Sequence, residues 1–503
     1  MAPRRTYKWK TRPYVHQVLA VKKLLSTGWG GALLMAPRTG KTKTFIDYAS
    51  ILYTAGKINR VLIFCPVSVL GVWEEEFKVH CPVPYRLIVW DRESRKYKTL
   101  PKFGSDRLDV VVLNYDALSS PGMAYINKQG YKVRSKTKGG RFDVMKKLVE
   151  WQPHLICLDE SHRIKTPTAR KTKMICKLGP VADYRVIMTG TVVTKKKRLF
   201  DIWSQWQFLN PDLFDMDFSE FKTHYGKWIQ RHGYSQWIKN MHEDELHQLI
   251  HADSFAITRE ECFDLPPRLA PEIIRVPLVE SAAAYDEMAR EMVHRIQTGE
   301  ITEASVQLVQ VLRLAQICSG VAKTNPTEEY PDGRLYRLGR EKLNVIEDFL
   351  TDLMESYEKV VIGARFISDI LGVEEICKRL DIKCYSLYGA VPRKQRDINI
   401  KNFRAWTSTG AVFVMQPQAG SLGIDLSTAG TFIWLSLTPS YVDYTQAEDR
   451  IALNADARGT RFIYVMGEDT VDEILYNVLQ EDGDVAKAIM SSPESLLRRS
   501  RTR

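Results

Sequence analysis

The sequence predicts an α/β protein with two parallel-sheet lobes and a mainly helical insertion between them. Short apolar runs alternate with amphipathic stretches in two separate regions, residues 61–188 and residues 360–465. Strands that are apolar on both faces are typical of parallel sheets covered by helices on both sides. With 503 residues, the chain is also too long to fold around a single hydrophobic core.

These runs divide the chain into four segments. We expect a first lobe at residues 1–195 and a second at residues 336–485. Residues 196–335 are aromatic and helical in pattern, with few strand signals, and residues 486–503 are a basic tail that we expect to be disordered. The runs expected to form strands are residues 31–35, 61–65, 110–113, 155–158 and 186–188 in the first lobe and 360–363, 384–387, 412–415, 432–435 and 462–465 in the second.

The composition is that of an ordinary soluble protein, with 44% apolar and 26% charged residues. Since no apolar run approaches the roughly 18 residues of a membrane-spanning helix, we expect a cytoplasmic protein. The eight cysteines form no C-x-x-C pair, so we interpret them as reduced structural residues and expect no zinc site. The net charge of +12 favours a polyanionic partner, with a merely solvated basic surface as the alternative. Residues 127–141 form a basic stretch that suits phosphate contacts or is simply solvated.

A candidate phosphate-binding loop lies at residues 35–42, before a stretch, residues 43–54, with the pattern of a helix. A triphosphate needs backbone N–H groups in a turn, a cation for its β and γ phosphates, and a hydroxyl for Mg²⁺. The match to G-x-x-x-x-G-K-[ST] is incomplete, because Met35 occupies the first glycine position and Arg38 stands where a second glycine is common. A surface turn before a helix therefore stays an alternative. The residues that would supply the three groups are Thr39, Gly40, Lys41 and Thr42.

Gln17 precedes an amphipathic segment, residues 18–25, upstream of this loop. Its amide offers a donor and an acceptor together, as an adenine edge requires. The alternative is a glutamine at a helix end that faces water, and the spacing alone does not separate the two.

An acidic pair, Asp159 and Glu160, follows the apolar run at residues 155–158. Side chains at the carboxyl end of a strand in an open parallel sheet project into the ligand crevice. There Asp159 would hold Mg²⁺ through its water shell, and Glu160 would accept a proton from the attacking water. An acidic pair that caps a helix is the alternative, which the upstream loop and a second strand-end motif at residues 188–191 disfavour.

Together these motifs resemble those of superfamily 2 helicases of the DEAD/DEAH type, and more closely the SWI/SNF-like DNA translocase branch. The similar segments keep the family's order from about residue 12 to residue 473. In the first half they are residues 40–42 (GKT), 65–77 (CPVSVLGVWEEEF), 159–162 (DESH) and 254–267 (SFAITREECFDLPP). In the second half they are residues 387–389 (LYG), 419–426 (AGSLGIDL) and 446–450 (QAEDR).

The resemblance implies two RecA-like lobes of the P-loop NTPase type, which clamp ATP between them and move along a nucleic-acid strand by opening and closing. It assigns roles to several residues of the first lobe. These are Gln17, Thr39, Gly40, Lys41 and Thr42 for ATP, Thr42 and Asp159 for Mg²⁺, Asp159, Glu160 and Lys41 for hydrolysis, and Thr189 and Thr191 for coupling between the lobes.

In the second lobe, the resemblance assigns Gly423 and Asp425 to the lining of the nucleotide cleft. Arg450 would bind ATP and neutralise charge on its γ-phosphate from the opposite lobe, which would make hydrolysis depend on closure. Three further positions correspond to contacts of relatives with the nucleic-acid backbone, namely Ser68, Tyr115 and Arg365.

The chain departs from the family pattern at three places. Leu453 stands where a second arginine is usual, residues 454–456 replace an I-G-Q ending, and Val192 replaces the proline after T-G-T. Because an arginine finger is worth about 10³ to 10⁵ in rate, loss of the second arginine would slow turnover by orders of magnitude. Substitution by Arg458 from a shifted loop is a hypothesis, which unchanged ATPase activity of Arg458→Ala would dismiss.

The sequence thus predicts an ATP hydrolase that moves along double-stranded DNA in replication, repair or recombination, similar to minimal bacterial or bacteriophage members of the branch. A strand-separating helicase on DNA or RNA carries the same motor motifs and is the first alternative. Leu453 motivates a second, an ATP-dependent DNA clamp that hydrolyses weakly. The third is the motor of a restriction system, which would need a separate nuclease chain.

Overall fold

The structure is a computed structural model of the chain. The residues that it describes are 7–90, 100, 106–118, 124–126, 132–134, 141–190, 199–231, 234–258, 261–262, 269–298, 300, 304–323, 334–353, 358–418, 424–451, 459–481 and 492–497.

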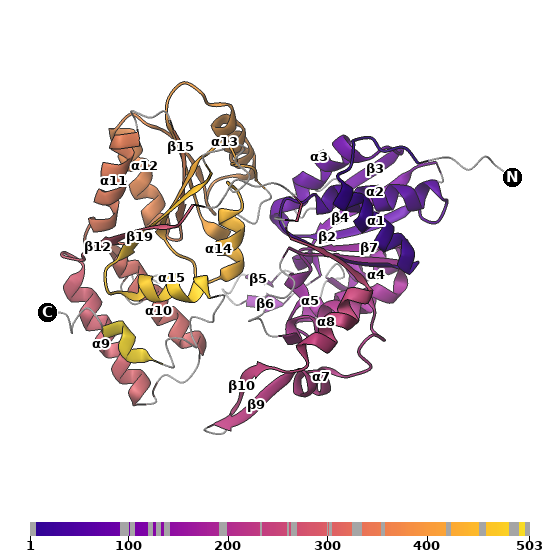
Figure 1. Cartoon of the computed structure of the whole chain (residues 1–503), viewed down its shortest axis with the longest axis horizontal. Helices are drawn as coiled ribbons and strands as arrows, with labels where there is room; N and C mark the ends of the chain where they lie inside the picture. The colour runs from indigo at the N-terminus through magenta and orange to yellow at the C-terminus, as the bar shows by residue number, and fades with distance from the viewer. Residues whose placement is uncertain are drawn as a thin grey trace. The chain divides into compact units, whose positions relative to one another are not determined.

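Two compact units make up the chain, Met1–Asp264 and Leu265–Arg503. The first is coloured from indigo to magenta in Figure 1, and the second continues through orange to yellow. Each unit has its own parallel sheet between helices, so the predicted two-lobed α/β fold is confirmed.

A seven-stranded sheet forms the centre of the first unit, in the order β11-β1-β8-β7-β2-β4-β3. All neighbouring strands in it are parallel. Since parallel strands end at one edge, the segments that follow β1, β8 and β7 lie side by side at that edge. The strands are β1 (Gly30–Met35), β2 (Arg60–Cys65), β3 (Tyr85–Trp90), β4 (Leu108–Asn114), β7 (Leu155–Asp159), β8 (Tyr184–Met188) and β11 (Ser254–Ile257).

Helices cover both faces of this sheet. Alternate strand residues point to opposite faces, so Ile63 and Cys157 belong to one apolar cluster while Phe64 and Leu158 belong to the other. This double burial explains the unbroken apolar runs in the sequence. The helices on the first face are α1 (Val15–Thr27), α2 (Lys41–Thr54) and α3 (Leu70–His80). Those on the second are α4 (Arg141–Trp151), α5 (Arg170–Leu178), α6 (Trp203–Leu209), α7 (Phe218–His224) and α8 (Glu243–Ala252).

Two antiparallel hairpins complete the first unit. One pairs β5 (Ala124–Ile126) with β6 (Lys132–Arg134), and the other pairs β9 (Gly226–Arg231) with β10 (Tyr234–Asn240). The β9–β10 hairpin projects beyond α7 in Figure 1. Trp228 at its base packs against the second apolar cluster.

A six-stranded parallel sheet forms the centre of the second unit, in the order β12-β19-β18-β15-β17-β16. Its strands are β12 (Glu272–Val276), β15 (Lys359–Ala364), β16 (Lys383–Leu387), β17 (Ala411–Met415), β18 (Thr431–Ser436) and β19 (Arg461–Gly467), and a separate hairpin joins β13 (Val321–Lys323) to β14 (Leu335–Arg337). The helices on one face are α9 (Ala282–Gln297), α10 (Ala304–Cys318), α13 (Arg393–Ala405), α14 (Tyr441–Glu448) and α15 (Val471–Gln480). Those on the other are α11 (Glu341–Leu353) and α12 (Ile367–Arg379).

The ten predicted strands are present, each within two residues of its expected ends. Among the described residues, three strands of the two large parallel sheets escaped prediction, namely β3, β11 and β12, as did the strands of the hairpins. All three lie at sheet edges, where only one neighbour pairs with the strand. Every residue of β3 is half-buried, for example, so it lacks the two-sided burial that marks the central strands.

The predicted helical insertion, residues 196–335, differs from the arrangement in the structure. The boundary between the units falls inside it, after Asp264. Helices α6 to α8 pack on the first sheet and β11 joins that sheet, whereas β12, α9 and α10 belong to the second unit. The segment also contains the β9–β10 hairpin. Each half of this segment therefore completes the core of its own unit.

Among the described residues, none of the helices combines the length and the low polarity that crossing a bilayer requires.

Candidate nucleotide-binding site

The loop between β1 and α2 turns through two residues with left-handed backbone, Arg38 (φ 65°) and Gly40 (φ 85°). Such residues are typical of the concave turns in which backbone N–H groups gather around an anion, and the N-terminus of α2 adds its positive dipole end. Left-handed backbone costs a residue with a Cβ about 1 to 2 kcal/mol, which explains why glycine is common at the position of Arg38. Because Arg38 adopts that conformation, the loop keeps its turn despite the departure from the motif.

Lys41 begins α2, and its side chain reaches back to the end of β1. Its Nζ donates to the carbonyl oxygens of Met35 at 2.8 Å and Ala36 at 3.2 Å. The same positive charge lowers the pKa of Asp159, which ends β7. The cation of the loop and the acidic pair therefore lie within electrostatic reach of each other.

Helix α1 is tied to the loop by two buried side chains. His16 Nε2 lies 2.8 Å from the carbonyl oxygen of Thr39, and Gln17 Nε2 donates to the same oxygen at 3.2 Å. Gln17 Oε1 accepts a hydrogen bond from the backbone N–H of Tyr14 at 3.0 Å. With Gln17 only 3% exposed, the alternative of a glutamine facing water is wrong.

The two threonines of the loop differ in their surroundings. Thr39 is buried, and its Oγ1 donates to the carbonyl oxygen of Ala36 at 2.8 Å. Thr42 is half-buried in the first turn of α2. Thr39 therefore shapes the turn, and Thr42 is the threonine whose hydroxyl suits Mg²⁺.

We expect Gly40→Ala to disrupt this loop. An added Cβ would lie 2.1 Å from Gln17 Nε2, on a backbone that disfavours L side chains. The variant should lose about 2 to 3 kcal/mol of unfolding free energy and bind ATP at least about tenfold more weakly. Chemical unfolding and nucleotide titration measure the two effects.

Gly56→Ala is the matched control. Gly56 has a similar left-handed backbone (φ +69°), but nothing lies within 4 Å of an added Cβ. Gly56→Ala should therefore lose only the unfolding free energy that left-handed backbone costs a residue with a Cβ, about 1 to 2 kcal/mol. Its affinity for ATP should be unchanged. Equal losses of stability and affinity in both variants would contradict the close contact between Gly40 and Gln17.

Asp159 is held at the carboxyl end of β7 by two buried side chains. Its Oδ2 accepts a hydrogen bond from Trp73 Nε1 at 3.2 Å, and its carbonyl oxygen accepts one from the Tyr115 hydroxyl at 2.8 Å. Burial and the charge of Glu160 raise the pKa of Asp159 to about 7, against the opposing effects of Lys41 and Trp73. A carboxyl group of this kind is suited to a divalent cation, because the cation takes the place of the proton.

Glu160 directly follows, with left-handed backbone (φ 53°). Its Oε2 lies 3.3 Å from His162 Nδ1, and that nitrogen lies 3.5 Å from the hydroxyl of the buried Thr189. Strand β8 lies between β1 and β7 in the sheet, which places Thr189 between the phosphate loop and the acidic pair. A polar chain thus runs from the predicted base to the predicted coupling residue.

The binding of Mg²⁺ with nucleotide should strengthen as the pH rises through about 7, since protonated Asp159 cannot bind a cation. Trp73→Phe removes the hydrogen bond that lowers this pKa and should move the midpoint to higher pH. Nucleotide titrations on both sides of pH 7 measure the shift. A midpoint that is the same in both proteins would contradict the assigned role of Trp73.

Asp159 also makes stability depend on pH. Its pKa is higher in the folded chain than the ordinary value of 3.8, so the folded chain binds this proton more tightly. Its contribution to the unfolding free energy is therefore fully present below pH 3.8 and is lost as the pH rises toward 7.

The second unit holds the predicted Arg450 just after α14, whose end is fixed by a buried carboxylate. Glu448 Oε1 accepts hydrogen bonds from Trp434 Nε1 at 3.1 Å and from the Tyr464 hydroxyl at 2.5 Å. The carbonyl oxygen of Arg450 accepts the N–H of Leu426 at 3.1 Å. This bond joins the two segments of the second unit to which the family resemblance assigns roles in nucleotide binding.

Asp425 is half-exposed and forms an ion pair of 3.2 Å with Arg404 at the end of α13. Several residues of the predicted set and its departures lie outside the described residues, namely Thr191, Val192, Gly423, Leu453, Arg458 and residues 454–456.

The three predicted nucleic-acid contacts differ in their surroundings. Tyr115 is 3% exposed and its hydroxyl is bound to the Asp159 carbonyl, so its side chain does not lie on a surface where a strand could bind. Arg365 is half-buried and donates from a guanidinium nitrogen to Thr438 Oγ1 at 3.2 Å. Of Ser68, only the backbone is described, in a 3-10 turn at Val67–Val69.

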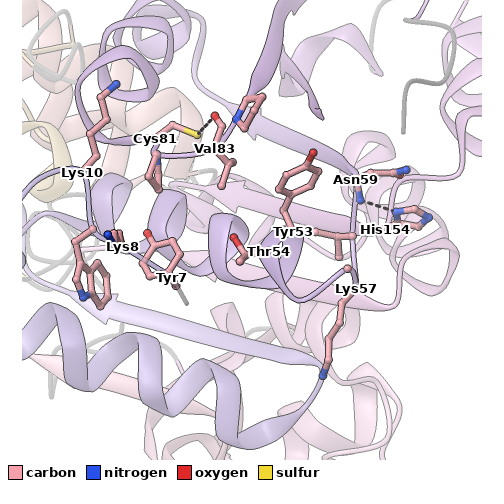
Figure 2. A pocket seen from close by; sticks show the side chains of 15 residues that line it. Tyr7, Lys8, Lys10, Tyr53, Thr54, Lys57, Asn59, Cys81, Val83 and His154 are labelled. Carbon is pink, nitrogen blue, oxygen red and sulfur yellow. Dashed lines mark hydrogen bonds between the residues drawn. The ribbon is translucent and has the colours of Figure 1, made fainter. Parts of the chain in front are cut away.

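A separate cavity of about 770 Å³ lies in the first unit. Figure 2 shows Tyr53 and Thr54 in its wall, at the end of α2 opposite Lys41. A helix of 14 residues is about 20 Å long, so this cavity is distinct from the nucleotide-binding loop.

Three side chains that the sequence did not single out support the site, namely His16, Trp73 and His162. Each stood next to or inside a segment already recognised. No local pattern marked the roles of His16 and Trp73, because their partners lie 23 and 86 residues away in the chain.

A phosphate-binding loop at the carboxyl edge of a parallel sheet, with an acidic pair two strands away, defines a P-loop nucleotide-binding protein. The second α/β unit is the further feature of helicase-type ATPases. Comparison with protein families agrees, since the SNF2-related domain matches residues 16–321 and the Helicase conserved C-terminal domain matches residues 341–453. The chain belongs to the SNF2-related family of helicase-like ATPases.

The relatives are distant in sequence. Transcription regulatory protein SNF2 of Saccharomyces cerevisiae is 23% identical over 474 residues, which cover 89% of this chain and 26% of that protein. Probable ATP-dependent DNA helicase CHR12 of Arabidopsis thaliana is 23% identical over 482 residues, covering 93% of this chain and 41% of that one. The chain thus spans less than half of either relative.

Among solved structures, the SWI2/SNF2 ATPase core of Sulfolobus solfataricus in complex with dsDNA is similar. It is 21% identical, covers 98% of this chain and 96% of its own, and superposes with a TM-score of 0.42. The predicted bacterial or bacteriophage origin is not tested by these relatives and stays a prediction.

Proposed function

We propose that this protein hydrolyses ATP to move along double-stranded DNA. The observation that carries the proposal is the convergence of Lys41, Asp159 and Glu160 at one edge of the first sheet, in a chain of the SNF2-related family. A triphosphate bound at the loop brings its γ-phosphate next to the acidic pair. Replication, repair and recombination are the processes that the proposal favours.

The first unit would bind ATP and Mg²⁺. Lys41 moves from the carbonyls of Met35 and Ala36 to the β and γ phosphates, and the N–H groups near Gly40 take the remaining phosphate oxygens. Thr42 and Asp159 are the residues that would hold Mg²⁺, which neutralises phosphate charge when bound. Gln17 donates one N–H of its side-chain amide to the carbonyl oxygen of Thr39, and the second N–H of that amide would bind adenine.

Hydrolysis would begin when the Glu160 carboxylate accepts a proton from a water aligned with the γ-phosphorus. His162 contacts both Glu160 and Thr189. A displacement of Glu160 when the γ-phosphate is lost would therefore be transmitted to the end of β8. We propose that Thr189 and Thr191 pass this change between the lobes, which couples hydrolysis to movement.

The second unit would complete the catalytic groups. We propose that Arg450 neutralises charge on the γ-phosphate and that Gly423 and Asp425 line the same cleft. The buried Glu448 supports this role, because it fixes the end of the helix that precedes Arg450. To line the cleft, Asp425 would break its ion pair with the exposed Arg404. This would cost little free energy, since exposed ion pairs are worth about 0.2 to 1 kcal/mol.

Duplex DNA is the proposed track. The net charge of +12 supports a polyanionic partner, and the relative CHR12 of Arabidopsis thaliana is named as a probable DNA helicase. Arg365 stays a candidate contact, whereas the burial of Tyr115 argues against its side chain.

A strand-separating helicase is the second candidate, and one feature favours it. Separation needs a wedge, and the β9–β10 hairpin projects from the first unit in Figure 1. Ile229 and Ile238 on this hairpin are each 40% exposed and could pack against unstacked bases.

Two DNA substrates distinguish the candidates. A translocase displaces the third strand of a triplex and leaves the duplex intact, whereas a helicase separates the strands of a labelled fork. We expect ATP-dependent triplex displacement by the wild type and none by Lys41→Ala. Fork separation without triplex displacement would favour the helicase, and DNA binding that depends on nucleotide without phosphate release would favour the clamp.

A further inference from the structure

A cluster of two histidines and a glutamate lies at the root of the β9–β10 hairpin, outside the nucleotide site. His224 ends α7, His242 immediately precedes α8, and Glu245 lies in the first turn of α8. Each offers one ligand atom, and these atoms all lie within 4.8 Å of one another. His224 Nε2 is already 3.1 Å from Glu245 Oε1.

We propose that His224, His242 and Glu245 bind one Zn²⁺ ion or a similar divalent transition metal. Two imidazole nitrogens and one carboxylate oxygen suit zinc, whereas Mg²⁺ and Ca²⁺ prefer oxygen ligands alone. Water would occupy the fourth position of a tetrahedral site, since His242 and Glu245 are both exposed.

The distances are close to those of such a site. Ligands about 2.0 to 2.1 Å from a tetrahedral zinc lie about 3.3 Å from one another. The pair formed by His224 and Glu245 already meets this spacing. The imidazole rings of His224 and His242 stack with centroids 4.5 Å apart and planes at 15°, so rotation of the exposed His242 ring closes the remaining distance.

The carboxylate of the cluster is oriented from the interior. The Tyr225 hydroxyl donates to Glu245 Oε1 at 2.9 Å, and Tyr225 itself is fully buried against Phe221. A buried partner that holds a ligand in place is typical of metal sites, because it reduces the freedom lost on binding. His242 is also held with left-handed backbone (φ 50°), which directs its side chain at a cost that a ligand role would explain.

The local charge favours a cation. The N-terminus of α8 contributes about half a positive charge, which opposes metal binding. Three carboxylates in the same turn outweigh it, and they are Glu243, Asp244 and Glu245.

The metal would clamp the hairpin. His224 and His242 are the residues on either side of the segment 225–241, which contains β9 and β10. One ion that binds both residues closes this segment into a loop and so reduces the conformational freedom of the unfolded chain, as a disulfide does. The site therefore fixes the hairpin root on the first unit, whatever activity that unit has.

Untagged full-length protein tests this proposal by competition for Zn²⁺ against a chromogenic chelator. We expect one ion per chain in the wild type and at least about a hundredfold loss of affinity in the double variant His224→Gln/His242→Gln. Removal of zinc by a chelator should lower the thermal unfolding temperature of the wild type and leave that of this double variant unchanged. A circular dichroism spectrum and nucleotide binding equal to those of the wild type establish that the double variant is folded.

A second histidine pair on α8 supplies the matched control. His247 and His251 lie one turn apart on α8 with ring centroids at 6.1 Å, and neither belongs to the cluster of His224, His242 and Glu245. His247→Gln/His251→Gln should keep wild-type zinc affinity. Equal affinity of the wild type and the His224→Gln/His242→Gln variant would overturn the site, as would a thiolate charge-transfer band in the Co²⁺-loaded wild type, which would assign the metal to cysteine.

Discussion

Lys41→Ala is expected to reduce ATP hydrolysis by about 10² to 10³, the loss typical of one preorganised charge at a transition state. Lys41 places its ammonium at the end of β1, bound to two backbone carbonyls that ATP phosphates can replace as partners. A backbone N–H supplies only a partial positive charge, so the N–H groups of the loop cannot replace the ammonium of Lys41. Phosphate release at saturating ATP measures the loss.

The same variant should change Asp159. The charge of Lys41 lowers the pKa of that carboxyl, so its removal raises this pKa further and moves Mg²⁺-dependent nucleotide binding to higher pH. Lys57→Ala is the control, because Lys57 is an exposed lysine in the loop after α2, beside the cavity in Figure 2. Hydrolysis by Lys41→Ala within a few fold of that by Lys57→Ala would show that the loop does not bind the phosphates.

Glu160→Gln is expected to lower the rate of hydrolysis by about 10² to 10⁴, the contribution typical of a general base. Glutamine keeps the size and the left-handed backbone position of Glu160, but its amide cannot accept the proton of the attacking water. Single-turnover hydrolysis of bound ATP isolates this step from nucleotide binding.

Nucleotide binding by Glu160→Gln should become stronger, although hydrolysis becomes slower. The charge of Glu160 raises the pKa of Asp159, so its removal leaves Asp159 ionised at lower pH and strengthens Mg²⁺-dependent binding below pH 7. Glu150→Gln, on the exposed surface of α4, controls for the loss of a carboxylate from the first unit. A Glu160→Gln variant with weakened binding and unchanged single-turnover hydrolysis would contradict the assignment of the base.

The central part of the fold was predictable because burial on both faces leaves a local signal. Strand β7, for instance, is an unbroken apolar run that ends at Asp159, and its residues belong alternately to the two apolar clusters. The edge strand β11 has no such signal, since only Ser254 of its four residues is buried and Ala256 is exposed. The split of residues 196–335 between the units depends on long-range packing, which periodicity does not encode.

The residues of the nucleotide site were predictable only as a set of motifs. Lys41 and Asp159 were found from their positions after apolar runs, and the structure brings them within electrostatic reach. Tyr115 was assigned to the nucleic-acid backbone from the family resemblance alone, and such a resemblance does not reveal that its hydroxyl donates inward to Asp159. The histidine cluster gave no signal, since His224 and His242 meet only because a hairpin returns the chain to its starting point.

Phosphate release by the wild type, measured without polymer and with single-stranded DNA, duplex DNA or RNA, tests the central claim most directly. We predict that duplex DNA raises the rate above that with every other polymer, and that Lys41→Ala lowers the stimulated release by about 10² to 10³. Stimulation by RNA alone, or a rate that no nucleic acid changes, would contradict a motor that moves along duplex DNA.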